Sequence, residues 1–181
     1  MDPIAPITVN SQGLTLDFLG GSPRTVVPTP SGTILFMAVG TGTYTLPVLP
    51  AAAKGTLEVW ASIASVAIQT IASLHNGVRE YQLGTTTSGG GNLFVSVDSS
   101  AGNLGTASGL PTPSMLGRIL KLQFSWDAVA GNAYFRMGSV SQTVTLGAWS
   151  PFQPTTLRLG DNRVGDAAFT GTIYRSFVTT Q

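Results

Sequence analysis

The chain has 181 residues, which fits one domain whose hydrophobic core alone can hold it together. It contains no cysteine, which excludes disulfides and thiolate metal sites, and only 9% of its residues are charged, against about 25% in a typical soluble domain. The net charge of +1 indicates neither a nucleic-acid surface nor an anionic-membrane surface, and the scarcity of charge favours a protein whose surface is partly covered in a stable assembly.

Residues 1–50 are set apart by seven prolines, at positions 3, 6, 23, 28, 30, 47 and 50. Because proline cannot donate to a strand ladder, we expect this segment to form edge strands, an arm on a neighbour or an anchor. Two runs in it, 14–19 and 34–39, have the composition of strands. No basic and apolar leader is visible, so no secretory signal is expected, and no stretch approaches the roughly 18 apolar residues of a transmembrane helix.

Residues 51–181 are predicted to form a β-sandwich. In 56–63 the apolar side chains alternate, and in 118–126 they do so most clearly, because Leu120, Leu122, Phe124 and Trp126 share one face. Residues 63–74 fit either a helix or a strand, and the β-branched content and the Asn76-Gly77 turn that follows favour a strand entering a hairpin. Roughly ten short strands and no convincing helix predict an all-β fold of two antiparallel sheets.

The last third of the chain carries a recognisable order of segments. A strand at 120–127 ends in an aromatic–Asp pair, turns through Gly131-Asn132 and is followed by a strand that ends at Gly138; later come 157–160, a polar loop and 169–175. Together with the strand at 55–60, this order resembles that of concanavalin A-like and laminin G-like domains over residues 55–178. The resemblance implies a two-sheet jelly roll, a fold often used to bind glycans and found in many bacteriophage virion proteins after a short N-terminal attachment segment. The fold also hosts glycanases and capsid parts, so it does not fix the function.

Catalysis is not expected. Glycoside hydrolases use two carboxylates about 5 to 9.5 Å apart, and the resemblance implies that they would stand at alternate positions of one strand. The chain has only two glutamates, Glu58 and Glu80, and neither has an acidic residue two positions away. The single histidine, His75, adjoins the predicted turn, where a solvated side chain is favoured over a catalytic base. A glycoside hydrolase therefore ranks as the least favoured alternative.

The candidate ligand-binding residues lie mostly on two loops. Sugars need exposed aromatic rings and planar polar groups, and the candidates are Trp149, Asp161, Asn162, Asp166 and Tyr81. Trp60 is expected to pack rather than bind. No cofactor is expected, and the only candidates for calcium ligands are Asp98, Asp161 and Asp166, with Asn162 beside them. The competing interpretation of 161–166 is an Asx turn in which Arg163 balances a carboxylate.

The favoured interpretation is a non-catalytic virion protein, such as a capsid decoration, spike or tail-fibre component. It would be made in the host cytoplasm, attach to other virion proteins through residues 1–50, and self-associate, with a trimer favoured. Its lectin-like domain would face outward. The alternative is a soluble carbohydrate-binding module for cell-surface polysaccharide, which would use the loops around Trp149 and 161–166. Neither nucleic acid nor a membrane is an expected partner.

Overall fold

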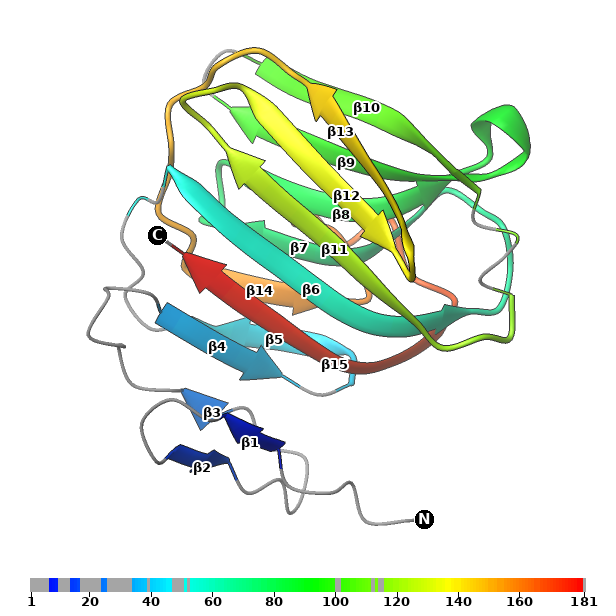
Figure 1. The fold of residues 1–181 in the computed structure, drawn as a ribbon, viewed down its shortest axis with the longest axis horizontal. Coiled ribbons are helices and arrows are strands. Elements are labelled where there is room, and N and C mark those ends of the chain that lie inside the picture. The colour runs from blue at the N-terminus through cyan, green and yellow to red at the C-terminus, as the bar shows by residue number, and fades with distance from the viewer. Residues whose placement is uncertain are drawn as a thin grey trace.

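A computed structural model describes residues 7–9, 14–16, 24–25, 34–38, 40–46, 51, 53–99, 102–111, 113 and 116–180. These residues form two antiparallel sheets that face one another, and a separate pair of short strands (Figure 1). The two-sheet antiparallel sandwich predicted from the sequence is confirmed. In this described part of the chain, no helix has the length and apolar character needed to cross a membrane.

The seven-stranded sheet has the order β13-β12-β11-β6-β15-β4-β3 and lies nearer the viewer in Figure 1. Its strands are β3 (Arg24–Thr25), β4 (Ile34–Ala38), β6 (Lys54–Ile63), β11 (Leu120–Asp127), β12 (Asn132–Met137), β13 (Val140–Thr145) and β15 (Gly171–Thr180). Its central strand β6 therefore has neighbours from far along the chain on both sides, β11 and β15.

The six-stranded sheet has the order β10-β9-β8-β7-β14-β5. Its strands are β5 (Gly42–Thr45), β7 (Gln69–His75), β8 (Glu80–Thr86), β9 (Asn92–Ser99), β10 (Gly102–Pro111) and β14 (Thr156–Leu159), and the short helix η1 (Ser88–Gly90) joins β8 to β9. Strands β7 to β10 form a meander, whereas β14 and β5 arrive from distant parts of the chain. The remaining two strands, β1 (Ile7–Val9) and β2 (Leu14–Leu16), pair with each other.

The N-terminal segment contributes strands to both sheets. Strand β4 pairs with β15 in one sheet, and β5 pairs with β14 at the edge of the other. The described sandwich thus begins before residue 51, although most of residues 1–33 and all of 47–50 lie outside the described residues. An attachment role for this segment stays a prediction.

The core lies between the sheets and follows the predicted alternation. Phe124 lies opposite Leu57, and Leu122 lies opposite Val59, and all four side chains are fully buried. Each such side chain contributes about 1.5 to 3 kcal/mol when it leaves water. A one-residue slip of β11 against β6 would expose the apolar face of β11, so this register is strongly specified.

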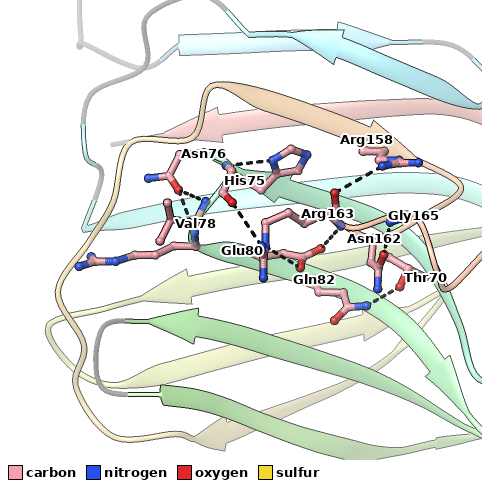
Figure 2. Close-up of polar contacts among 12 residues, drawn as sticks. Thr70, His75, Asn76, Val78, Glu80, Gln82, Arg158, Asn162, Arg163 and Gly165 are labelled. Carbon is pink, nitrogen blue, oxygen red and sulfur yellow. Dashed lines mark hydrogen bonds and ion pairs between the residues drawn. The ribbon is translucent and has the colours of Figure 1, made fainter.

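The ambiguous stretch 63–74 resolves into a loop and a strand. Strand β7 covers 69–75 and forms a hairpin with β8, as the β-branched content predicts. The turn is organised by Asn76, whose Oδ1 accepts hydrogen bonds from the backbone N–H groups of Val78 (3.1 Å) and Arg79 (2.8 Å) (Figure 2).

Candidate functional site

Two aromatic residues that the sequence placed in a ligand site lie in the core instead. Tyr81 is fully buried between the rings of Trp126 and Phe152, with centroids 4.5 and 4.4 Å away and nearly parallel planes. Trp149 is 6% exposed, and its Nε1 donates a hydrogen bond to the Tyr81 hydroxyl at 3.3 Å. The loop around Trp149 folds inward because these rings bury large apolar areas while their polar atoms pair with each other. Burial also raises the pKa of Tyr81.

The loop 161–166 satisfies its own polar groups. The Asp161 carboxylate accepts hydrogen bonds from the backbone N–H groups of Asn162 (2.8 Å) and Ala167 (3.0 Å), and Arg158 pairs with it at 3.2 Å. The Asn162 Oδ1 accepts from the N–H of Gly165 (2.8 Å), and its Nδ2 donates to Asp166 (2.5 Å). Asn162 thus closes the turn through the backbone N–H groups of the residues three and four positions ahead, Gly165 and Asp166. Arg158 pairs with Asp161, and Arg163, which is expected from the sequence to balance a carboxylate, lies 3.8 Å from that of Glu80.

The calcium ligands that the sequence offers are Asp98, Asp161 and Asp166. Among the described residues, no group of three or more His, Cys, Asp and Glu side chains is placed to hold a metal ion. Asp161 would have to release three donors before it could ligate an ion. Asp98 lies in β9 with its backbone opposite Glu80, and its side chain lies outside the described part.

The same loop is fastened to the outer face of the six-stranded sheet through Glu80 (Figure 2). The Glu80 carboxylate accepts the backbone N–H of Arg163 at 2.9 Å and lies 3.8 Å from the Arg163 guanidinium, which also donates to the Gly77 carbonyl at 3.2 Å. His75 stands opposite Glu80 in the register. Burial lowers the pKa of His75, and the neighbouring Glu80 opposes that shift. We interpret the contacts of Glu80 and Gly77 with Arg163 as a clasp that holds the 161–166 loop against β8.

A different surface, the outer face of the seven-stranded sheet, is hollowed and carries both aromatic and polar side chains. Strands β11, β6 and β15 lie side by side there (Figure 1). Their register brings nine side chains into three rows, which we call the outer-face array. Its rows are Ser125–Thr56–Thr179, Gln123–Glu58–Phe177 and Lys121–Trp60–Arg175. Within the paired segments 56–60, 121–125 and 175–179, these nine side chains alternate with residues that face the core.

A hollow runs over the first two rows. It has a volume of about 310 Å³ and is lined by Thr56, Glu58, Gln123, Phe177 and Thr179. A second hollow of about 190 Å³ shares Thr56 and Thr179 and extends toward Lys54 and Ser125. Together they form a shallow groove along the strands, with the half-buried ring of Phe177 in its wall.

The polar groups of the array are fixed by one another. Glu58 pairs with Lys121 at 2.6 Å and accepts a hydrogen bond from Trp60 Nε1 at 3.2 Å. Ser125 shares a hydrogen bond with Thr56 at 2.8 Å and accepts one from Gln123 at 2.9 Å. Such mutual support holds the side chains in place before a ligand arrives, which lowers the entropy lost on binding.

Comparison with known proteins identifies the fold. No protein-family model matches the chain, and no curated protein matches it in sequence. Among solved structures it is similar to the CBM40 of Ruminococcus gnavus IT-sialidase bound to α2,3-sialyllactose (18% identity, 77% of this chain, 86% of that chain, TM-score 0.57). It is also similar to domain 4 of AbnA, a GH43 extracellular arabinanase from Geobacillus stearothermophilus, in complex with arabinotriose (19% identity, 89% of this chain, 76% of that chain, TM-score 0.55). A third similar structure is that of the mouse laminin α1 chain, domains LG4-5 (12% identity, 96% of this chain, 47% of that chain, TM-score 0.59). The fold is concanavalin A-like. At these identities the likeness concerns the fold alone.

Of the outer-face array of this concanavalin A-like sandwich, the sequence alone indicates only Trp60 and its neighbour Glu58. Trp60 was noted on the face opposite Leu57 and Val59, beside Glu58, but packing was expected for it. The alternation at 118–126 also turned Lys121 and Gln123 away from the core, and this was the signal that could have located the groove. The contribution of β15 could not be found in this way, because it depends on a long-range pairing with β6.

Proposed function

We propose that this chain is a carbohydrate-binding module that holds a sugar on the outer-face array of the seven-stranded sheet. One observation carries the proposal: the groove combines the aromatic ring of Phe177 with the carboxylate, amide and hydroxyl groups of Glu58, Gln123, Thr56 and Thr179. Sugars present an apolar C–H face and a rim of hydroxyls, so they need both kinds of group within one shallow surface.

The solved structures with bound glycans support this proposal over the virion role. The CBM40 and the AbnA domain named above are complexes with sialyllactose and arabinotriose, and both share the fold. The virion role, with its trimer and its place in a particle, rests on the low charge of the chain, the proline-rich residues 1–50 and the resemblance in fold. The two roles are compatible, because a spike or fibre can bind sugar.

We further propose binding without hydrolysis. The two glutamates stand on the outer faces of different sheets, Glu58 in β6 and Glu80 in β8, so they cannot flank one glycosidic bond. Glu80 is also engaged by Arg163. Release of reducing ends from a polysaccharide, abolished in Glu58→Gln, would contradict this part of the proposal.

The groove is tested by removing its ring. A glycan array on the purified chain selects a ligand, and calorimetry then compares Phe177→Ala with the wild type. We expect the affinity to fall roughly tenfold or more, because a stacked ring is a typical anchor of a binding surface. Val140→Ala is the matched control, since Val140 is an exposed apolar residue of β13 at the far edge of the same sheet. Equal affinity of Phe177→Ala and the control would reject the groove as the site.

A further inference from the structure

Arg175, at one end of the outer-face array, lies against two aromatic rings. Its guanidinium carbon lies 4.4 Å from the centroid of the Trp60 ring and 5.8 Å from that of Phe177, which lines the groove. Within the described part of the chain, no carboxylate, carbonyl or hydroxyl accepts a hydrogen bond from it. Aromatic faces therefore place the guanidinium, and none of the described residues accepts its N–H groups.

Three other cations on this face, among those whose side chains the structure describes, are already engaged. Lys121 pairs with Glu58 at 2.6 Å, Lys54 pairs with Asp127 at 2.9 Å, and Arg136 donates to the Gly138 carbonyl at 2.8 Å. Since Lys121 matches the charge of Glu58, the array keeps one positive charge without a counter-charge. That charge is Arg175.

A β-bulge puts Arg175 in this place. Ile173 pairs with Ala61 and Arg175 pairs with Trp60, so Tyr174 is an extra residue in β15. Without it, strict alternation would set Arg175 opposite Val59 and turn it into the core. Bulges are known to re-aim a side chain in this manner beside functional sites. The bulge therefore sets Arg175 opposite Trp60, in the row next to the one that holds Phe177.

We propose that Arg175 makes this groove a site for acidic sugars, in which it binds the carboxylate of a uronic or sialic acid while the sugar ring extends toward Phe177. The inference rests on the proposed function and names its ligand class. A guanidinium presents a planar fork of donors that matches a carboxylate in two parallel hydrogen bonds. The attraction between the guanidinium and the Trp60 ring holds Arg175 at this place, and a carboxylate would bind through its N–H donors.

The test compares acidic and neutral sugars that differ only in the carboxylate. Calorimetry on the full chain would compare oligogalacturonate with its carboxyl-reduced form, and sialyllactose with its own carboxyl-reduced form. The two pairs distinguish a uronic acid from a sialic acid as the ligand. We expect one acidic sugar to bind about tenfold or more tighter than its neutral counterpart. Arg175→Gln should abolish that preference, and Arg175→Lys should lose most of it, because an ammonium keeps the charge and loses the fork.

Arg136→Gln is the matched control for charge. Arg136 is an exposed residue of β12 on the same face, and three strand spacings, about 14 Å, separate β12 from β15. The control should keep the preference within about twofold. If Arg136→Gln and Arg175→Gln reduced the preference for acidic sugars equally, the inference would be overturned. Such a result would mean that the net charge of the protein attracts the acidic sugar. Equal binding of acidic and neutral sugars, still sensitive to Phe177→Ala, would overturn it and leave the proposed function standing. Binding of no sugar by the wild type would reject both.

Discussion

Single residues determine whether the loops of this sandwich can close. Gly131 ends the turn between β11 and β12 with a φ of +68°, and an added Cβ would lie 2.4 Å from the carbonyl carbon of Gly147. Gly77 also has a positive φ, +87°, but an added Cβ there would meet nothing within 4 Å. An alanine at Gly77 would therefore suffer backbone strain alone, whereas an alanine at Gly131 would suffer backbone strain and steric overlap.

Replacing these glycines by alanine should have unequal effects. We expect Gly77→Ala to lower the free energy of unfolding by about 1 kcal/mol, which is the strain of a left-handed alanine. Gly131→Ala should lose roughly 1 to 3 kcal/mol more, because backbone atoms of the 147–148 segment cannot move aside as a flexible side chain would. Urea unfolding followed by circular dichroism measures both. Similar losses in the two variants would show that the overlap at Gly131 relaxes freely.

His75 is the only histidine in the chain, so it dominates side-chain titration near neutral pH. Burial lowers its pKa, Arg158 and Arg163 lower it further, and Glu80 opposes them. The unfolded state then takes up a proton at a higher pH than the folded state does. Stability should accordingly be full above the ordinary value of about 6.5 and decline as the pH falls below it. The midpoint of urea unfolding, measured from pH 8 to pH 5.5, tests this, and His75→Gln should remove most of the slope in that range. A wild-type midpoint that rises on acidification would contradict the assignment.

At the scale of elements, the clasp between β8 and the 161–166 loop is expected to stabilise the fold more than the surface ion pairs do. Glu80 is 8% exposed and accepts a backbone N–H from the loop. Glu80→Ala should cost about 1 to 3 kcal/mol, since it leaves that donor without its partner. Lys54→Ala, which breaks a pair whose lysine is 59% exposed, should cost less than about 1 kcal/mol. Hydrogen exchange at the Arg163 amide would locate the effect: exchange unchanged in Glu80→Ala would show that the loop is held by other contacts.

The hydrogen bonds within the same loop bear on calcium. Asp161 uses both carboxylate oxygens, one on two backbone N–H groups and the other on Arg158. We expect the thermal midpoint to stay the same in excess calcium and in excess chelator, because an ion would gain ligands only after those bonds were broken. A rise in the midpoint with calcium, lost in Asp161→Asn, would restore the ion-binding interpretation of this loop.

The sequence predicted the elements of the fold better than its functional surface, for physical reasons that particular residues show. Strands β6 and β11 were predictable because each buries an alternating set of apolar side chains. The inward fold of Trp149 was not, since a tryptophan before Pro151 in a polar loop looks exposed until the backbone N–H of Trp149 is seen to bond the Ala128 carbonyl at 3.1 Å. Strict alternation in 171–178 would place Ile173, Arg175 and Phe177 on one face, and only the bulge separates them. The pairing of β15 with β6 and the bulge within β15 cannot be predicted from the periodicity of apolar residues along the sequence.

For the whole molecule, the scarcity of charge still predicts self-association. Only 9% of residues are charged, and among the described residues Val140 at the edge strand β13 and Ile119 just before β11 are each 53% exposed. An edge strand offers unpaired backbone groups, and few charges stand there to oppose pairing with another copy. We expect the purified protein to be a stable homo-oligomer, a trimer by preference, with a mass of about three times 18.7 kDa in light scattering at roughly micromolar concentration. A monomer under those conditions would argue against assembly through this surface. It would leave the sugar site unaffected, because the outer-face array draws all nine of its residues from one chain.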